Sequence, residues 1–239
     1  MSINFFEYEI SQSFPEFDIR NKQMIINTIN PHSFCVAEDD KKFKEALIKS
    51  DILIPDGIGI VWRLRFLRSK KIFRITGADM HDYLLKYANS KKLRIFYLGS
   101  NEKTLKKITG RNSKDFDHII SGSFSPVYKD EFSIEDSLEM INAVNSFSPD
   151  ILFIGMTAPK QEKWAYSYKE KLNAQLIVSI GAVFDFYAGN IKRAPKWMIS
   201  LGLEWLFRFF LEPKRLWKRY VINNTRFILY IVNEKFNRG

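Results

Sequence analysis

Short apolar runs alternate with segments of helical periodicity over most of the chain, from residue 24 to about residue 181. The apolar runs predict strands at residues 24–29, 52–54, 94–98, 118–120, 151–154 and 176–180. The periodic segments between them predict helices at residues 38–49, 58–67, 79–88, 102–107, 134–146 and 160–172. Because strands that alternate with helices form βαβ units, the pattern indicates the α/β class, with a mostly parallel sheet flanked by helices.

The pattern changes after residue 190. Residues 201–211 are rich in large apolar side chains, and charged residues recur every three or four positions along one helical stripe: Glu204, Arg208, Glu212, Arg215 and Arg219. Pro213 interrupts this segment, which predicts a kink or two successive helices. We therefore expect a core of residues 1–191 and a helical C-terminal appendage of residues 192–239.

Cysteine content and the N-terminus limit the possible classes of protein. The single cysteine, Cys35, excludes an internal disulfide framework and a cysteine zinc site, and it favours a reducing, intracellular compartment. The N-terminus lacks the basic and apolar regions of a secretory signal. No charge-free apolar stretch approaches the roughly 18 residues that span a bilayer, so we expect no transmembrane anchor.

Charge is concentrated in the appendage. The chain has a net charge of +10, and residues 192–239 contain eleven basic and three acidic residues, together with three of the five tryptophans. Basic and aromatic residues in one segment suit an anionic membrane face, a nucleic acid or a diphosphate-bearing ligand. An amphipathic helix packed on the core is the competing interpretation. The wide aromatic face supports a membrane-facing or substrate-covering role about as well as it supports packing on the core.

Several predicted strands end in turn residues, and ligands bind at the carboxyl ends of strands in open parallel sheets. Asp56 follows one such strand within Pro55-Asp56-Gly57. Its carboxylate is suited to capping the next helix. Alternatively, it removes a proton from an incoming hydroxyl group, provided that burial raises its pKa from the reference value of about 4.

Further polar groups are predicted at the same edge. Thr28 and Asn30 end the first strand, and Arg74, Thr76 and Gly77 supply guanidinium, hydroxyl and amide donors suited to sugars and phosphates. These five residues are candidate substrate contacts.

Two later turns complete this set of candidates. Lys160 and Gln161 open a helix, where backbone N–H groups and the ammonium group suit phosphate oxygens. Gly181 ends a strand, and Asp185 follows it, placed either to accept hydrogen bonds from a ribose or base or to cap a turn.

Two other kinds of site receive weak support. Gly57-Ile58-Gly59 begins like a dinucleotide fingerprint, but Trp62 stands at the third glycine position. Asp115-Phe116-Asp117 has the spacing of metal-binding carboxylates, yet it leads into a predicted strand as exposed residues often do. The histidines show no ligand spacing and are interpreted as capping or core residues: His32, His81 and His118. We expect neither a metal nor a cofactor.

The turn motifs, taken in order, resemble the WecG/TagA/CpsF family of bacterial glycosyltransferases, glycosyltransferase family 26. The similarity extends over residues 24–220. It rests on Thr28-Ile29-Asn30, Pro55-Asp56-Gly57-Ile58-Gly59, Arg74-Ile75-Thr76-Gly77, Ala158-Pro159-Lys160-Gln161-Glu162, Phe184-Asp185-Phe186-Tyr187-Ala188-Gly189, Lys192-Arg193-Ala194-Pro195-Lys196-Trp197, Gly202-Leu203-Glu204-Trp205 and Glu212-Pro213-Lys214-Arg215-Leu216-Trp217-Lys218-Arg219-Tyr220. Thr157 departs from the glycine that many members have before the Ala-Pro-Lys-Gln-Glu motif.

The resemblance implies a Rossmann-like core and transfer of a sugar, with inversion, from a UDP-sugar to a sugar on a polyprenyl diphosphate. The donor sugar would be N-acetylmannosamine, N-acetylmannosaminuronic acid or glucose. The appendage would complete the site at the inner face of the bacterial cell membrane, so the protein would be cytoplasmic and peripheral, and a homo-oligomer is reasonable. Alternatives from other classes are a basic nucleic-acid-binding protein and a non-catalytic interfacial scaffold.

The resemblance also implies residue roles. Asp56 would be the catalytic base, and Asp185 would contact the nucleotide. The donor-sugar or pocket contacts would be Thr28, Asn30, Arg74 and Gln161, and the diphosphate contacts would be Arg208, Arg215 and Arg219.

Overall fold

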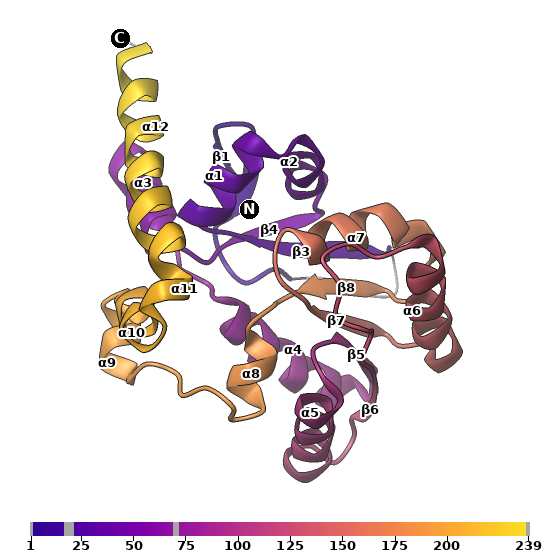
Figure 1. Cartoon of the computed structure of the whole chain (residues 1–239). Helices are drawn as coiled ribbons and strands as arrows, with labels where there is room; N and C mark the ends of the chain where they lie inside the picture. Colours follow the sequence, from indigo (N-terminus) through magenta and orange to yellow (C-terminus); the bar gives the residue numbers. More distant parts are fainter. Residues whose placement is uncertain (1, 17–21, 69–71, 238–239) are drawn as a thin grey trace.

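The computed structural model describes residues 2–16, 22–68 and 72–237. Within these residues a six-stranded sheet with the order β4-β3-β8-β7-β5-β6 forms the centre of the molecule, and every neighbouring pair is parallel (Figure 1). Its strands are β3 (Met24–Ile29), β4 (Ile52–Pro55), β5 (Arg94–Gly99), β6 (Ile120–Phe124), β7 (Ile151–Gly155) and β8 (Leu176–Ser179). The predicted Rossmann-like α/β class is confirmed.

Helices cover both faces of this sheet. Helices α4 (Gly77–Lys91), α5 (Glu102–Asp115) and α8 (Val183–Tyr187) pack on one face, and α6 (Ile134–Phe147) and α7 (Lys160–Tyr168) pack on the other. A short 3-10 helix, η1 (Lys169–Lys171), follows α7. Since successive strand residues point to opposite faces, Tyr97 belongs to the first apolar cluster and Phe96 to the second. The result is a three-layer arrangement with a core on each side of the sheet.

The first crossover contains two helices where the sequence predicts one at residues 38–49. Helix α1 (Pro31–Asp39) starts at a capping box of Asn30 and Ser33, with Pro31 in its first turn. Asp40 ends α1, and its side chain accepts a hydrogen bond from the Phe43 N–H at the start of α2 (Lys41–Ile48). The helix predicted at residues 38–49 is confirmed as α2 with a later start, whereas α1, which Asp40 separates from it, was not predicted.

The strand predicted at residues 118–120 also needs correction. Helix α5 extends to Asp115, and β6 begins at Ile120, two residues later than predicted. Asp115 is therefore the last residue of a helix, where it pairs with Arg111 at 3.1 Å, and it does not lead into a strand. Among the described residues, no group of three or more His, Cys, Asp or Glu side chains is placed to hold a metal ion.

An N-terminal hairpin was not predicted from the sequence. Strands β1 (Ser2–Phe5) and β2 (Tyr8–Ser11) pair antiparallel. The hairpin buries Ile3, Phe5, Tyr8 and Ile10 in a third apolar cluster. That cluster also contains residues of α1, α2 and α3 (Ile58–Arg68), and Phe227 of the C-terminal helix. The two ends of the chain thus meet in one small core.

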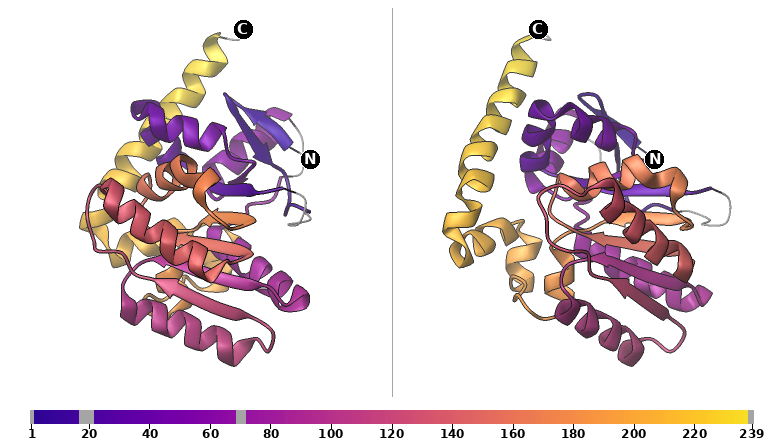
Figure 2. Two further views of the ribbon diagram at one scale, coloured as in Figure 1. Left: turned by 90° about the vertical axis from the view of Figure 1, so that its right-hand side faces the viewer. Right: turned by 45° about the vertical axis from the view of Figure 1, so that its right-hand side comes forward.

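The C-terminal segment forms a series of helices beside the sheet (Figures 1 and 2). They are α9 (Lys196–Ser200), α10 (Glu204–Leu211), α11 (Pro213–Trp217), the π-helical turn η2 (Lys218–Ile222) and α12 (Asn223–Asn237). The predicted interruption at Pro213 is confirmed, since α10 ends just before it and α11 begins on it. None of the helices in the described parts of the chain has the length and apolar composition needed to span a bilayer.

Contacts with α1 hold α12 in place. The Phe227 ring lies 5.4 Å from the Phe34 ring, and Arg226 forms a two-armed ion pair with Asp39. Figure 2 shows the C-terminal part of α12 extending beyond the rest of the fold. The boundary at residue 191 stays a prediction.

Gly155 ends β7 at a position where a side chain does not fit. An added Cβ would lie 2.4 Å from the Phe184 ring. Gly110 lies within α5, and an added Cβ there would meet nothing within 4 Å.

We predict opposite effects of two glycine substitutions on stability. Gly155→Ala forces Phe184 to move and should lower the free energy of unfolding by about 1–3 kcal/mol. Gly110→Ala should raise it by about 0.5–1 kcal/mol, because alanine restricts the unfolded chain and favours the helix. Urea unfolding measures both values, and equal stabilities for the two variants would contradict the packing at Gly155.

Candidate active site

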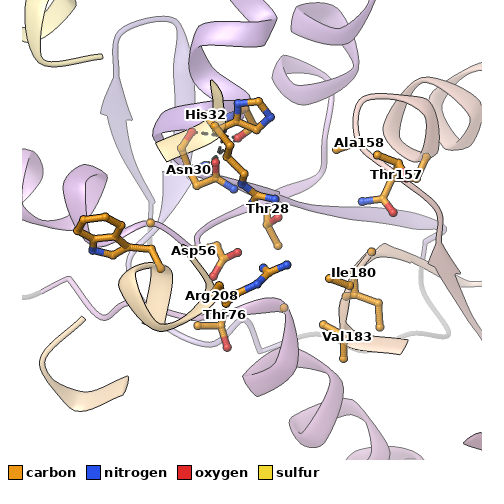
Figure 3. Close-up of a pocket in the computed structure, with 18 of the residues that line it drawn as sticks. Thr28, Asn30, His32, Asp56, Thr76, Thr157, Ala158, Ile180, Val183 and Arg208 are labelled. Atoms are coloured by element: carbon orange, nitrogen blue, oxygen red, sulfur yellow. Dashed lines mark hydrogen bonds between the residues drawn. The ribbon is translucent and has the colours of Figure 1, made fainter. Parts of the chain in front are cut away.

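A cleft of about 1650 Å³ lies at the carboxyl edge of the sheet, between the strand-end turns and the C-terminal helices (Figure 3). Strands β4, β3, β8 and β7 are consecutive neighbours, so the turns that follow them meet at this edge. Every residue named above as catalytic or substrate-binding lines the cleft: Thr28, Asn30, Asp56, Arg74, Thr76, Gly77, Lys160, Gln161, Gly181, Asp185, Arg208, Arg215 and Arg219.

Asp56 directly follows β4 and points into the cleft (Figure 3). Its backbone N–H donates to the Ile29 carbonyl at 3.0 Å, which ties it to the end of β3. Within the described residues its carboxylate accepts no hydrogen bond. Burial raises the pKa of Asp56 to about 6; Arg74 and Arg219 oppose this rise, and Glu204 and Asp79 add to it.

The end of β3 supplies two cleft residues with different surroundings. Thr28 lies beside Ile54 of β4, one position before the strand end. Asn30 caps α1, where its side-chain oxygen accepts from the Ser33 N–H at 3.0 Å. The side-chain oxygen of Asn30 is therefore already bound within the protein, and its contact with the donor sugar stays a prediction.

Internal contacts also hold the segment Arg74–Gly77. Arg74 donates from Nη2 to Glu204 at 2.9 Å, and both side chains are largely buried. The Thr76 hydroxyl accepts from the Asp79 N–H at 3.1 Å, so it caps α4. Gly77 approaches α8 so closely that an added Cβ would lie 3.2 Å from Val183. These residues shape the cleft wall, and their contacts with substrate stay predictions.

The turn between β7 and α7 orients Gln161. Its Oε1 accepts from the Met156 N–H at 3.2 Å, and its Nε2 donates to Glu162 at 2.8 Å. Gly181 lies next to this amide group, and a Cβ added to Gly181 would be 3.5 Å from it. Thr157, the position that departs from the family pattern, lines the cleft in the same turn.

Lys160 points toward a neighbouring loop. Its ammonium group donates to the carbonyl of Lys129 and lies 4.6 Å from the centre of the Phe132 ring and 5.2 Å from that of Tyr128. The sequence places Lys160 at the start of a helix, but it carries no signal that the loop after β6 lies beside that helix. Tyr128 and Phe132 are cleft residues that the sequence analysis missed.

Glu162 is a second missed residue. It is only 2% exposed, and one of its carboxylate oxygens has no hydrogen-bond partner among the described residues. Burial raises the pKa of Glu162 to about 7, against the lowering effects of the Gln161 hydrogen bond and the Arg219 charge. In the sequence, an acidic residue in the first turn of a helix is typical of an exposed position, so only the packing distinguishes it.

Guanidinium groups of the appendage enter the cleft opposite these carboxyl groups. Figure 3 shows Arg208 pointing inward, and its carbon Cζ lies 5.3 Å from the centre of the Phe186 ring. The Nε atoms of Arg208 and Arg219 are buried without a partner among the described residues. Burial lowers the pKa of Arg219, so its charge is incompletely compensated by the protein. Such groups suit an anionic ligand.

Two other predicted contacts have protein partners. Arg215 is largely exposed and pairs with Glu212 of the same segment at 2.7 Å. Asp185 accepts a hydrogen bond from Asn190 at 3.1 Å. Both residues line the cleft, and each would have to give up its existing protein contact in order to bind substrate.

His32 joins α1 to the C-terminal helix at the cleft wall. Its Nδ1 lies 2.6 Å from the Asn223 amide nitrogen. Burial lowers the pKa of His32 to about 4, and Arg219 and Lys218 act in the same direction, so the ring is neutral at pH 7. A capping or core role was expected from the sequence; the structure adds that this histidine contacts the appendage.

The fold and the cleft define an α/β protein with an enzyme-like site, in which one carboxylate without a hydrogen bond from the described residues faces two guanidinium groups whose Nε atoms are buried. The model of the Glycosyl transferase WecG/TagA/CpsF family matches residues 8–239, and the chain belongs to this family. The family assignment and the glycosyltransferase class inferred from the turn motifs are thereby confirmed.

Named relatives support the same assignment. The chain is 32% identical over 214 residues to a Bacillus subtilis protein, covering 90% of this chain and 81% of the relative. It is 30% identical to a Bacillus spizizenii protein, covering 84% and 76%, and 26% identical to a Staphylococcus aureus protein, covering 81% and 74%. All three relatives are named N-acetylglucosaminyldiphosphoundecaprenol N-acetyl-beta-D-mannosaminyltransferase.

We predict that Glu162 makes stability fall as the pH rises. Its pKa is raised from 4.5 when unfolded to about 7 when folded, so its contribution is complete below pH 4.5 and is lost as the pH rises through 7. At about 1.4 kcal/mol per unit, the loss is of order 3 kcal/mol. Glu162→Gln should reduce the difference in unfolding free energy between pH 5 and pH 8.

Urea unfolding at the two pH values measures this difference. Glu139→Gln on the exposed face of α6 serves as the control and should leave the difference unchanged. If Glu162→Gln behaves like this control, then Glu162 is not a buried acid with a raised pKa.

Proposed function

We propose that this protein transfers a sugar from a UDP-linked donor to a sugar carried on a polyprenyl diphosphate, with inversion at the anomeric carbon. The observation that carries the proposal is the unpaired Asp56 carboxylate, with its raised pKa, in a cleft that also contains Arg208 and Arg219. A base and an anion-binding group are the two elements that this reaction requires.

In the proposed reaction Asp56 accepts the proton of the acceptor hydroxyl group. The hydroxyl oxygen forms a bond to the anomeric carbon of the donor while the bond from that carbon to the diphosphate oxygen breaks. UDP leaves with the bonding electrons from the face opposite the attack. A single carboxylate suffices as the base. Negative charge develops on the leaving diphosphate, and cations rather than a second carboxyl group stabilise it.

The electrostatics of the cleft fit these steps. A pKa of about 6 leaves Asp56 ionised at neutral pH and makes it a stronger base than an exposed aspartate. The leaving diphosphate would be stabilised by the guanidinium groups of Arg208 and Arg219, whose Nε atoms are already shielded from water. Accordingly, the proposed reaction uses no metal and no cofactor besides the UDP-sugar.

The names of the relatives narrow the substrate classes. They describe transfer of N-acetylmannosamine to N-acetylglucosaminyl diphosphoundecaprenol by those proteins. For this chain we propose an acceptor of the same chemical kind and a donor sugar of the N-acetylmannosamine, N-acetylmannosaminuronic acid or glucose type. The product would enter a bacterial cell-surface polysaccharide or teichoic acid.

The appendage supports a peripheral membrane location. Phe210, Trp217, Ile228 and Leu229 are more than half exposed, and the segment carries most of the net positive charge. Apolar side chains next to cations suit the surface of an anionic bilayer. We propose that residues 192–239 contact the inner face of the cell membrane from the cytoplasm, where the lipid-linked acceptor would be reached. A second copy of the chain is the alternative partner for this apolar face.

We predict that Asp56→Asn lowers the turnover number at least about 100-fold, because the amide does not accept the proton. UDP release is measured with each candidate UDP-sugar, a short-chain polyprenyl diphosphate acceptor and EDTA. The wild-type kcat/KM should rise with pH through an apparent pKa of about 6, since Asp56 must lose its proton first. Full activity of the folded variant would exclude Asp56 as the base, and loss of activity in EDTA would contradict the metal-free reaction.

We predict binding of the purified protein to vesicles rich in phosphatidylglycerol, with weaker binding at high salt. The double variant Ile228→Ser/Leu229→Ser should reduce the bound fraction several-fold, because it removes apolar surface. Leu138→Ser on α6 is the control, since Leu138 is also exposed but lies outside the appendage.

Two results would contradict membrane binding. Wild-type binding by the double variant would show that α12 does not contact lipid. A concentration-dependent dimer that is lost in the double variant would assign the face to a second subunit. Salt-sensitive binding to oligonucleotides without UDP release would instead support the nucleic-acid alternative.

A further inference from the structure

Glu204, the first residue of α10, connects two arginines from different parts of the chain. Its Oε2 accepts from Arg74 at 2.9 Å, and its Oε1 accepts from Arg193 at 3.1 Å. The Glu204 side chain is 14% exposed and that of Arg74 is 13% exposed. Both carboxylate oxygens are therefore used, one by Arg74 of the core and one by Arg193 at the start of the appendage.

The contacts of Arg193 extend this connection to α4. Its Nη2 donates to the Thr76 hydroxyl at 3.1 Å and lies 3.2 Å from an Asp79 carboxylate oxygen. Thr76 and Asp79 form the capping box that begins α4. The network of Arg74, Glu204, Arg193 and Asp79, which we call the ion-pair bridge, thus attaches α10 to the wall of the cleft.

The ion-pair bridge lies next to the candidate base. The Ile75 N–H, adjacent to Arg74, donates to the Pro55 carbonyl at 3.1 Å, immediately before Asp56. Arg74 and Arg219 favour the ionised form of Asp56, whereas Glu204 and Asp79 oppose it. Glu204 therefore influences Asp56 directly through its charge and indirectly through the arginine that it neutralises.

The same residue sets the placement of α10. Arg208 lies four positions after Glu204, so both project from the same side of the helix. Before the helix, Gly202 has a φ of +75°, and an added Cβ there would lie 2.7 Å from Ile58. The start of α10 is consequently held by close packing on α3 and by the ion-pair bridge.

We propose that Glu204 is a positioning residue of the active site: by joining Arg74 and Arg193 it fixes α10 so that Arg208 enters the cleft. Removing one member of a buried ion pair leaves an uncompensated charge, so the arrangement should not survive its loss. The catalytic part of this inference rests on the proposed function, whereas the placement of α10 does not.

The test compares Glu204→Gln with Glu139→Gln. The two changes are equal in charge, but Glu139 lies on the exposed face of α6 and belongs neither to the cleft lining nor to the ion-pair bridge. For Glu204→Gln we expect faster amide hydrogen exchange over residues 204–211 and a kcat at least tenfold lower. Glu139→Gln should leave kcat and exchange within about twofold of wild type, because an exposed charge far from the site contributes little.

A pH profile separates positioning from a general loss of structure. Removing the negative charge of Glu204 leaves Arg74 uncompensated beside Asp56, so the acid limb of kcat/KM should move to lower pH. A variant that is merely less folded would lose amplitude without moving the limb. If Glu204→Gln does not fold, Arg193→Gln removes one arm of the bridge, keeps the contact with Arg74, and should show a smaller change in exchange and kcat.

The outcomes distinguish this inference from the proposed function. Wild-type exchange over residues 204–211 in a folded Glu204→Gln variant would overturn the placement of α10. Wild-type kcat and an unmoved acid limb would overturn the catalytic part. Failure of the wild-type protein to release UDP with any donor would contradict the proposed function, while the exchange measurement would still decide the role of Glu204 in placing α10.

Discussion

The arrangement of the cleft depends on one half-buried carboxylate, Asp56, that has no hydrogen bond from the described part of the protein. Burial raises its pKa to about 6 against the opposing charges of Arg74 and Arg219, so without these cations the ionised form would be still less favourable. Those cations come from two places: Arg74 from the core and Arg219 from the appendage. The core by itself therefore contains the proposed base but only part of the positive charge around it, and the appendage supplies the rest.

Docking of the appendage in turn relies on both ends of the chain. Phe227 of α12 packs between the N-terminal hairpin and α1, with ring-centre distances of 6.2 Å to Phe5 and 5.4 Å to Phe34. Asn223 contacts His32, and Glu204 joins Arg74 to Arg193. Apolar packing thus holds α12, and buried ion pairs hold α10. The short elements between them, α11 and the π-helical turn η2, carry Arg215 and Arg219.

On the far wall of the cleft, hydrogen bonds and contacts with aromatic rings hold the side chains in place. Gln161 is fixed by the Met156 N–H and by Glu162, whose own pKa is raised by burial, and Lys160 is held over the rings of Tyr128 and Phe132. Lys160 and Gln161, which were predicted to contact substrate, thus already have partners within the protein. Their contacts orient these groups before any ligand binds, which reduces the free energy needed to order the site.

The sequence by itself determined the α/β class, the strand-end turns, the break at Pro213 and the family, because these depend on local periodicity and on motifs that are contiguous in the chain. All of the site residues that were predicted from the sequence line the cleft. Only the tertiary structure decided that Arg74 pairs with Glu204, that Lys160 points to a loop after β6, that Glu162 is buried and that the N-terminal hairpin supports α12. The physical reason is that pKa shifts and ion pairs depend on which distant segments exclude water from one another, and residue spacing carries no information about that.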